Sequence, residues 1–445
     1  MTVANEQLIE TSGKHVKKAV PVILFFFVLS LIIDNAFKLI SVDIAKDLGI
    51  SVTTVGWQAT LAGLIIGIGA VVYASLADSI SIRTLLSVGV VLICAGSLLG
   101  YLFHGSYTMI LVARVIQTAG LASAETLYVI YVSKYLPKAE QKKFLGFSTS
   151  SYSLSLVVGS LAGGYISTYL HWTTLFLVPL ITLLILPFIL KYLPKEKAKE
   201  TNVDIWGLLL IAAIATALML YLTNFNLWNI AAFIIAVILF GLHISKNPRS
   251  LIGVSFFKNR RFVSTLTVAF VIYSVQLGYI FMFPFILDQV YGLQLDTISL
   301  LLIPGYVTAI IVGALSGKIA EVFSSKQAIA IAIICISISL VLPAVFVNGS
   351  VILYVISMVL FSGSFAFMYA PMLDTCVSLI PEEKVGTAIG FFNLTLNVAA
   401  SIGIAYTAAM IDKVSFSKAL IVLICIAAFA LLLFGLLLGR SRKAV

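Results

Sequence analysis

The segment Tyr107–Lys134, YTMILVARVIQTAGLASAETLYVIYVSK, is long and apolar enough to cross a bilayer, yet it contains a full positive and a full negative charge. Arg114 and Glu125 are eleven residues apart, which places them within about 20° of one another around a helix and about 16 Å apart along it. Gln117 and Tyr128 flank the same face. Because a charge at the bilayer centre costs about 2.5–3.5 kcal/mol, this face predicts either a water-filled cavity or charged partners on another helix.

The composition of the whole chain is typical of a membrane protein. Of its 445 residues, 61% are hydrophobic and only 10% are charged, and the mean hydropathy is +1.12. A soluble globular chain has about 25% charged residues. We therefore expect a polytopic membrane protein, in which the net charge of +10 reflects membrane topology and not the binding of nucleic acid.

Fourteen segments reach the length of about 20 apolar residues that a membrane-spanning helix needs. They are expected near residues 19–41, 54–76, 83–103, 107–133, 144–168, 172–193, 205–223, 226–245, 262–287, 297–318, 326–347, 350–379, 385–411 and 416–439. With an even number of spans both termini lie on one side, and the loops of the other side contain only three basic residues, Lys46, Lys413 and Lys418. The positive-inside rule therefore predicts a multi-pass protein of the cell membrane with both termini in the cytoplasm.

A short motif occurs twice in loops predicted to be cytoplasmic. Ala74–Asp78 is followed by Arg83, and Gly317–Glu321, which begins 243 residues later, is followed by Lys326. In each copy a small residue is followed by an acid at the fourth position, and a base comes five residues after the acid. Parallel repeats of six-helix halves are a known transporter architecture, with substrate bound near the midplane between the halves.

The repeat offset covers eight expected spans, of which six make one half and two look inserted. We therefore expect an all-α membrane protein with three parts. These are a six-helix bundle (residues 1–200), a two-helix insertion (residues 201–246) and a second six-helix bundle (residues 247–445).

Ionisable residues inside the first and fourth expected spans are the candidate proton and substrate site. Asp34 and Lys38 share one helix face and lie about 6 Å apart along the axis. Asp34 and Arg114 fall at similar depth, so Asp34 either forms a fixed ion pair with Lys38 or Arg114 or takes part in binding protons or substrate. Glu125 falls in the inner half of the membrane. Because desolvation penalises a charged carboxylate, Glu125 is interpreted as a group that binds and releases a proton near neutral pH.

Polar residues in the second half are further candidates for a substrate cavity. Asp374 either lies in that cavity or at the cytoplasmic end of the twelfth span. Asn393 and Asn397, one helical turn apart, either line the cavity or form hydrogen bonds between helices. The complete expected cavity consists of Asp34, Lys38, Arg114, Gln117, Glu125, Tyr128, Asp374, Asn393 and Asn397.

Three motifs resemble those of the major facilitator superfamily, and within it the fourteen-helix drug:proton antiporters. The loop after the second span resembles G-x-L-A-D-x-x-G-x-[RK], from Ala74 to Arg83. The fourth span resembles R-x-x-Q-G-x-G, beginning at Arg114. The fifth span resembles the antiporter motif G-x-x-x-G-P-x-x-G-G. Its matching residues are Ser155, Gly159, Ser160 in place of proline, Gly163 and Gly164.

The resemblance implies a major facilitator fold of two six-helix bundles plus two central helices, fourteen spans in all. Within that family the chain resembles Gram-positive, staphylococcal-type tetracycline exporters, which exchange a drug, often a tetracycline carried as a chelate with a divalent cation, for protons. By this resemblance Asp78 and Arg83 would form a cytoplasmic gate and Gly159, Ser160, Gly163 and Gly164 the antiporter-motif helix. A monomer in the lipid bilayer, without a bound cofactor, is expected.

Two other functions compete with drug export. The chain contains no G-x-x-x-x-G-K-[ST] motif, so the energy for transport is expected from a proton gradient and not from ATP. A transporter of an endogenous lipid, fatty acid or other metabolite is the alternative to drug export. An enzyme or receptor is disfavoured because the sequence shows no metal-ligand spacing and no pairing of nucleophile with base.

Overall fold

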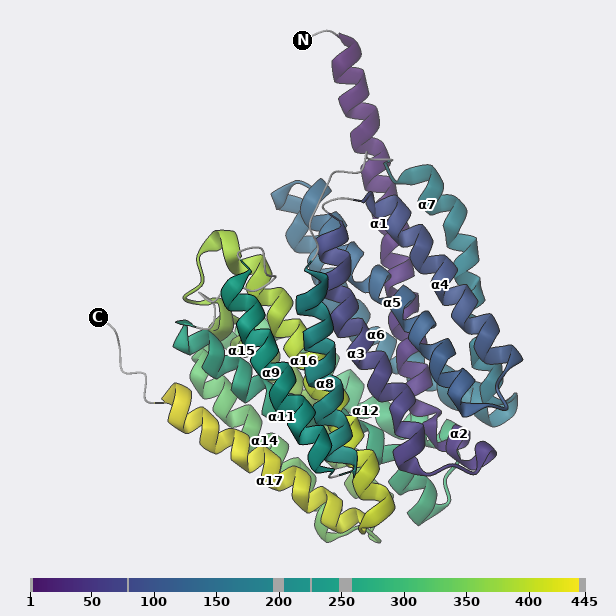
Figure 1. Cartoon of the computed structure of the whole chain (residues 1–445), viewed down its shortest axis with the longest axis vertical. Helices are drawn as coiled ribbons and strands as arrows, with labels where there is room; N and C mark the ends of the chain where they lie inside the picture. Colours follow the sequence, from purple (N-terminus) through teal and green to yellow (C-terminus); the bar gives the residue numbers. More distant parts are fainter. Residues whose placement is uncertain (1–2, 78–79, 195–203, 225, 248–257, 440–445) are drawn as a thin grey trace. The chain divides into compact units, whose positions relative to one another are not determined.

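The computed structural model describes residues 3–77, 80–194, 204–224, 226–247 and 258–439, and these residues form helices joined by short turns (Figure 1). Thirteen helices in the described part are long and apolar enough to cross a membrane, and Leu154–Tyr169 adds a shorter apolar helix. The predicted all-α membrane fold is confirmed. The thirteen full-length spans and the shorter one come close to the predicted fourteen.

Internal contacts divide the chain into two compact units, each discontinuous in sequence. The first unit contains Met1–Phe37 and Gly69–Val203, and the second contains Lys38–Ile68 and Asp204–Val445. The predicted three-part division at residues 200 and 246 stays a prediction, and its first boundary lies outside the described residues.

The first unit contains most of α1 and the end of α3, followed by the helices of the first half. Their bounds are α1 (Val3–Leu39), α4 (Ile82–Leu102), α5 (Tyr107–Tyr135), α6 (Lys138–Tyr169), η1 (Trp172–Phe176), η2 (Val178–Ile185) and α7 (Leu186–Tyr192). The span Trp172–Tyr192 therefore begins as two 3₁₀ segments and ends as an α-helix. Proline residues occur at the start of both η2 and α7, where a missing backbone N–H leaves no helical bond unmade.

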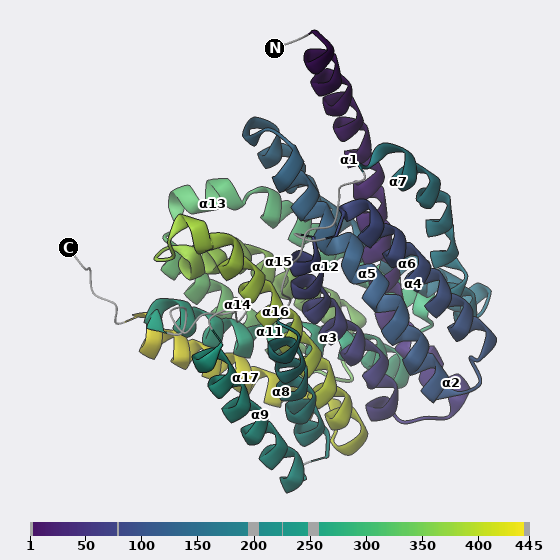
Figure 2. The same ribbon diagram turned by 45° about the horizontal axis from the view of Figure 1, so that its top comes forward.

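The second unit begins with a short helix and the first two-thirds of α3, and then continues from α8 onward. Its elements are α2 (Ser41–Leu48), α3 (Val52–Leu76), α8 (Ile205–Asn224), α9 (Leu227–Lys246), α11 (Arg260–Tyr291), α12 (Leu295–Ala314), α13 (Ser316–Val322), α14 (Ser325–Val345), α15 (Val351–Val377), α16 (Glu382–Lys413), α17 (Phe416–Phe434) and the π-helical turn η3 (Gly435–Gly439). In both views α8 and α9, the two inserted helices, run side by side (Figures 1 and 2).

Side chains and glycines at the helix ends explain where several helices begin and stop. Ser81 accepts a hydrogen bond from the backbone N–H of Thr84 at the start of α4. Asn259 accepts two backbone N–H groups at the start of α11. Gly292 ends α11 with a φ of 66°, a left-handed conformation that glycine adopts without steric cost. Side chains that accept the free N–H groups at a helix start stabilise it by about 1 kcal/mol.

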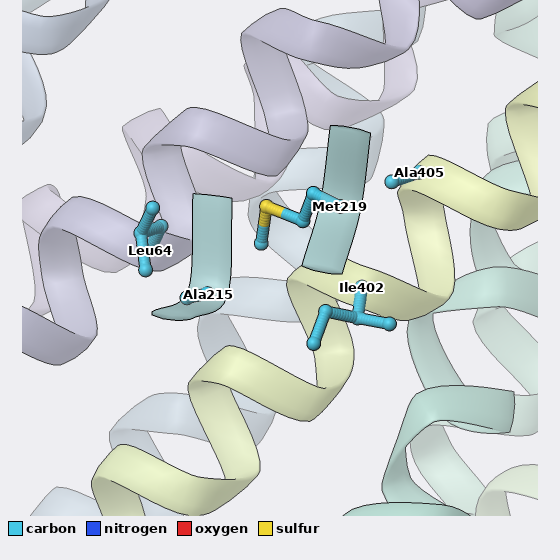
Figure 3. Packing of buried hydrophobic residues seen from close by; sticks show 5 residues of the cluster. All are labelled: Leu64, Ala215, Met219, Ile402 and Ala405. Atoms are coloured by element: carbon cyan, nitrogen blue, oxygen red, sulfur yellow. The ribbon is translucent and has the colours of Figure 1, made fainter. Parts of the chain in front are cut away.

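The inserted helix α8 packs on other helices of the second unit through an apolar cluster. Ala215 and Met219 of α8 lie among Leu64 of α3 and Ile402 and Ala405 of α16 (Figure 3). All five side chains are buried. This cluster attaches α8 to two helices at once.

The faces of α8 and α9 that lie outside this cluster are exposed and apolar. Trp206, near the start of α8, is 71% exposed, and Trp228, near the start of α9, is 81% exposed. Tryptophan is enriched where a membrane-spanning helix meets the water interface. At the first end of the hairpin Asp204 accepts a hydrogen bond from the Gly207 N–H at 2.9 Å and lies 2.7 Å from Nε2 of His243, the distance being between Nε2 and a carboxylate oxygen. The exposed surface is therefore that of a lipid-facing helical hairpin held together at one end.

Candidate functional site

A buried ion pair joins α1 to α5 inside the first unit. Nη2 of Arg114 lies 3.3 Å from Oδ1 of Asp34, and the two side chains are only 1% and 6% exposed. The pair is therefore shielded from water. Attraction within such a pair offsets the cost of removing two charges from water only when further hydrogen bonds complete the geometry. Of the two interpretations open for Asp34, this geometry matches the ion pair with Arg114.

The remaining bonds of Arg114 extend the pair into a network that reaches α4. Nη1 of Arg114 donates a hydrogen bond to the side-chain oxygen of Gln117. The amide nitrogen of Gln117 in turn donates to Oγ of Ser97, at 2.8 Å. Both Gln117 and Ser97 are fully buried. Three helices thus contribute to one polar network, and Ser97 is the member that the sequence interpretation missed.

An aromatic side chain covers the guanidinium group. The ring of Phe37, one turn after Asp34 on α1, lies 4.2 Å from the Arg114 guanidinium carbon. Phe37 also contacts the ring of Phe176, with 4.8 Å between ring centroids. A cation over an aromatic face is attracted by the ring, more strongly when water is excluded. Phe37 was missed because aromatic residues are frequent throughout this chain, so its spacing from Asp34 was the only signal.

Glycines of the antiporter-motif helix α6 set the position of Asp34. A Cβ atom on Gly159 would lie 2.8 Å from the carbonyl oxygen of Ile32 and 2.9 Å from Cβ of Asn35. A Cβ atom on Gly163 would lie 2.9 Å from the carbonyl oxygen of Ala36. The backbones of α6 and α1 therefore approach closely on both sides of Asp34, as small residues permit.

The other residues of the motif support this packing. Ser160 and Gly164 are buried on the same helix. Asn35 donates a hydrogen bond to Oγ of Ser155 across the α1–α6 crossing, at 3.3 Å. The motif thus acts structurally in the first unit by holding α1 in register with α6.

Tyr128 and Glu125 lie on α5 beyond the ion pair. Tyr128 is fully buried, stacks on Phe27 with 5.2 Å between centroids, and donates a hydrogen bond to the Phe144 carbonyl oxygen at 2.6 Å. Glu125 is half-buried. At 1.5 Å per residue it lies about 16 Å along the helix from Arg114, which is too far for an ion pair with that residue.

Lys38 is half-buried at the last turn of α1, and its carbonyl oxygen accepts a hydrogen bond from Ser41 Oγ at 2.9 Å. It belongs to the second unit, whereas Asp34 belongs to the first. The described contacts therefore bring Asp34, Arg114 and Gln117 together in one network, and the part of Lys38 in a common cavity stays a prediction.

The candidate cavity residues of the second unit lie at two separate places, one within α16 and one near the end of α15. Asn397 of α16 packs on α3, since a Cβ on Gly67 would lie 3.0 Å from its Cβ, and its amide donates to the Asn393 carbonyl oxygen at 3.0 Å. Asp374 is exposed near the end of α15 and accepts a hydrogen bond from Oγ of Ser325, at 2.8 Å. Asp374 thus lies at the helix end, the second of the two placements that the sequence left open.

The predicted cytoplasmic gate is described in part. Asp78 lies outside the described residues. Arg83 is half-buried in the first turn of α4, and its carbonyl oxygen accepts a hydrogen bond from Ser87 Oγ at 2.8 Å. The role of this pair in gating stays a prediction.

A polytopic helical protein that buries a neutralised charge pair between its spans has the construction of a secondary transporter. The chain belongs to the Major Facilitator Superfamily, whose family model matches residues 22–404. It is therefore a transporter and not an enzyme.

Curated relatives cover most of the chain at low identity. The riboflavin transporter RibZ of Clostridioides difficile (strain 630) is 24% identical over 370 residues, which cover 82% of this chain and 81% of the relative. The quinolone resistance protein NorB of Staphylococcus aureus is 27% identical over 443 residues in strain bovine RF122 / ET3-1, which cover 94% of this chain and 93% of the relative. The similarity to NorB supports the resemblance to staphylococcal efflux proteins.

Solved structures share the fold. The peptide-transporter-family protein PepTSo superposes with a TM-score of 0.72 at 12% identity, over 95% of this chain and 97% of that one. A D-xylose–proton symporter superposes with a TM-score of 0.72 at 15% identity, over 97% of this chain and all of that one. These similarities confirm the predicted major facilitator fold.

Proposed function

We propose that this transporter is a proton-coupled antiporter that exports amphipathic drugs, tetracycline among them, from the cytoplasm by alternating access. The support from relatives is the likeness to quinolone resistance proteins. The observation that carries the proposal is the position of Glu125, a half-buried carboxyl group within the apolar span of α5.

Glu125 and Asp34 differ in how much freedom they have to exchange protons. The Asp34 carboxylate faces a guanidinium group with almost no exposed surface, so its protonation would leave a buried positive charge without compensation. Glu125 lies about 16 Å along the helix from that guanidinium and is not fully buried. We assign Glu125 as the main proton carrier, with Asp34 in a supporting role.

Coupling needs only a small number of protons. One charge moving through 100 mV contributes about 2.3 kcal/mol, and one pH unit contributes about 1.4 kcal/mol. One or two protons therefore support a drug gradient of several decades. Proton and drug would each favour a different accessible state and shift the equilibrium by their difference in affinity for the two states.

A second candidate function has a specific observation behind it. The RibZ relative is described as a riboflavin transporter, and riboflavin is an endogenous, flat heteroaromatic compound. Transport of such a metabolite is therefore the alternative to drug export.

The proposal includes an arrangement in the membrane that follows from the loop charges. The protein would lie in the cell membrane as a monomer, with both termini in the cytoplasm. The substrate would bind beside the polar residues of α1 and α5 in the first unit, which are Asp34, Arg114, Gln117, Glu125 and Tyr128. Tetracycline would be carried as its chelate with a divalent cation.

The test uses inverted membrane vesicles with an acidified interior. Addition of an exported cationic drug should make the interior more alkaline, because each molecule taken up releases protons. Tetracycline, a quinolone, ethidium, riboflavin and D-xylose would be compared. A response to riboflavin alone would replace drug export by metabolite transport.

Glu125→Gln should abolish this alkalinisation while the protein level stays normal, because the amide cannot carry a proton. Glu140→Gln makes the same chemical change in the first turn of α6. It should leave the alkalinisation intact. A full response from Glu125→Gln would remove Glu125 from the mechanism.

A further inference from the structure

Two of the four histidines lie together at one end of the first unit, which the loop charges predict to be extracellular. His104 follows α4, and His171 lies between α6 and η1. Their rings lie 6.3 Å and 5.6 Å from the ring of Trp172, the first residue of η1, measured between centroids. Both histidines are exposed, whereas Trp172 is only 2% exposed. One buried tryptophan is therefore flanked by two imidazoles that water can reach.

The two imidazoles use the same ring nitrogen in opposite ways. Nδ1 of His104 lies 2.7 Å from the carbonyl oxygen of Tyr101, which can only accept a hydrogen bond, so this nitrogen carries a proton. Nδ1 of His171 accepts the backbone N–H of Thr173 at 3.4 Å and lies 2.9 Å from the Thr173 hydroxyl. Because a backbone N–H can only donate, this nitrogen carries no proton. Protonation therefore leaves the bond of His104 intact but removes the bond that His171 accepts.

The backbone at His171 is strained. Its φ is 154° and its ψ is 143°, and no other residue except glycine has a positive φ among the residues that the structure describes. This region of backbone conformation is nearly exclusive to glycine, and another residue stays there only when its surroundings hold it. The bond from Thr173 to the His171 ring is one of the contacts that hold this turn. Loss of that bond would leave the strain without its local support.

The segment that begins at this turn is an unusual span. It starts with the two 3₁₀ segments η1 and η2 before it becomes the α-helix α7. Runs of 3₁₀ helix longer than three or four residues are uncommon, and those inside a longer helix often mark a hinge. His171 therefore holds the outer end of the span that is most easily rearranged by its backbone geometry.

A row of ring contacts within the first unit leads from this turn to the buried ion pair. Trp172 contacts Phe176 with 6.4 Å between ring centroids, and Phe176 contacts Phe37 with 4.8 Å. Phe37 in turn covers the guanidinium group of Arg114 at 4.2 Å. Phe176 is fully buried, and a Cβ atom on Gly100 of α4 would lie 2.3 Å from its ring. The position of η1 therefore decides how the aromatic cover of Arg114 is packed.

The histidines are the groups of this region that change charge near neutral pH. Helices α4 and α6 and the segment η2 pack on η1, and residues 84–113 and 144–190 contain no Asp, Glu, Lys or Arg. On α1 the charged group is Asp34, which pairs with Arg114. Imidazole takes up a proton between about pH 5 and 8, whereas phenols stay protonated throughout that range. The phenols at this end of the neighbouring elements are Tyr101, Tyr107, Tyr165 and Tyr169.

We propose that His171 is an external pH switch: a proton taken from the outer water onto Nδ1 releases the start of η1 and with it the packing of Trp172. Because the ordered turn binds the neutral imidazole, its support is present at high pH and is lost as the pH falls. His171 is a positioning residue, acting on Arg114 through Phe176 and Phe37. The device goes beyond export itself, since it makes the surroundings of the buried pair respond to the pH outside.

Hydrogen–deuterium exchange tests the release without a substrate. The full chain in detergent micelles would be compared at pH 8 and pH 5, with each rate divided by that of an unstructured peptide at the same pH. The segment 173–177 should exchange about fivefold faster at pH 5, as expected for loss of one side-chain cap. The start of α4 is the internal control, because Ser81 accepts the Thr84 N–H through a hydroxyl that does not titrate. An unchanged rate at 173–177 would overturn the switch.

Three variants separate His171 from its neighbour. His171→Asn keeps a side-chain acceptor that does not titrate, so exchange should be slow at both pH values. His171→Ala removes the acceptor, so exchange should be fast at both. His104→Asn is the matched control, because it removes the other exposed imidazole beside Trp172, and it should keep the full pH response. A response that persists in His171→Asn, or that disappears in His104→Asn, would contradict the assignment to His171.

The emission of Trp172 supplies a second measurement. The other tryptophans, Trp57, Trp206 and Trp228, belong to the second unit and would be replaced by phenylalanine. Release of Trp172 into water should move its emission maximum to longer wavelength at pH 5, and His171→Asn should abolish this shift. An emission maximum that stays constant while the His171 imidazole is protonated would show that Trp172 remains packed and would overturn the proposal.

The switch and the proposed function fail in different ways. Exchange and emission need neither a drug nor a proton gradient, so a full pH response would stand even if Glu125→Gln left the alkalinisation of vesicles intact. Acidifying only the outer medium should shift the emission in vesicles with the native orientation and not in inverted ones. A shift in inverted vesicles alone would leave the switch standing and show that the predicted orientation of the termini is wrong.

Discussion

The two units repeat one helix crossing but bury different chemistry beside it. In the first unit Gly159 of α6 lies against α1, where a Cβ would be 2.8 Å from the Ile32 carbonyl oxygen. In the second unit Gly403 of α16 lies against α11, where a Cβ would be 3.1 Å from Cα of Ser274. Gly403 comes 244 residues after Gly159, close to the 243-residue offset of the loop motif. The repeat therefore extends from the loops into the packing of the helices.

The side chains buried near these crossings are not repeated. The first unit buries the charged pair Asp34 and Arg114. In the second unit Tyr279 bonds the hydroxyl of Ser357 at 2.8 Å, and Ser357 donates to the Ser339 carbonyl oxygen at 2.6 Å, all fully buried. Among the described residues of the second unit the only buried charged residue is Asp204, just before α8. The crossing is thus shared by the two units, whereas the buried pair of Asp34 and Arg114 lies in the first unit.

The largest predicted effect would break the charged interior of the first unit. Asp34→Asn leaves the Arg114 guanidinium buried without a counter-charge, so the free energy of unfolding should fall by about 3–5 kcal/mol. Denaturation of the purified protein in detergent micelles measures this change. The double variant Asp34→Asn/Arg114→Gln removes both charges and should recover most of the loss. A double variant no more stable than the single one would show that Asp34 does not stabilise the fold through its ion pair with Arg114.

The second prediction tests whether the crossing is shared. Gly159→Ala and Gly403→Ala each place a methyl group against the backbone of a neighbouring helix, and each should lower the free energy of unfolding by about 1–3 kcal/mol. Gly241 of α9 is the control, because a Cβ there meets nothing within 4 Å. Gly241→Ala should raise stability by about 0.5–1 kcal/mol. If only one of Gly159→Ala and Gly403→Ala leaves the free energy of unfolding unchanged, the two crossings are not equivalent.

The sequence predicted the helices and the similar depth of Asp34 and Arg114 because both depend on local quantities, but it left open whether Asp34 pairs with Arg114, pairs with Lys38 or binds protons or substrate. Apolar runs of about 20 residues predict spans, and depth in the membrane follows from position in a span. The further bonds of Arg114 could not be predicted, since Ser97 and Phe37 depend on how three helices pack. Likewise, His243 meets Asp204 across the insertion at 2.7 Å, a contact that the sequence analysis did not predict. Contacts between distant segments need tertiary structure that periodicity does not contain.

The smallest predicted effect concerns the neutral interior of the second unit. Ser357 donates its own proton to the Ser339 carbonyl oxygen, so the Tyr279 hydroxyl is the donor in the bond to Ser357. Tyr279→Phe removes that donor and leaves only an acceptor lone pair of Ser357 unused. The free energy of unfolding should therefore fall by about 1 kcal/mol. Tyr165→Phe, at an exposed tyrosine on α6, should change it very little.

A double-mutant cycle turns this small effect into a measure of how the units differ. The coupling between Tyr279→Phe and Ser357→Ala isolates one neutral hydrogen bond and should be about 1 kcal/mol. The coupling between Asp34→Asn and Arg114→Gln should be several times larger, because either single change leaves a buried group without its partner charge. Equal couplings in the two cycles would mean that the ion pair is screened by water despite its burial. The buried ion pair of the first unit would then contribute no more to the free energy of unfolding than the neutral hydrogen bond of the second.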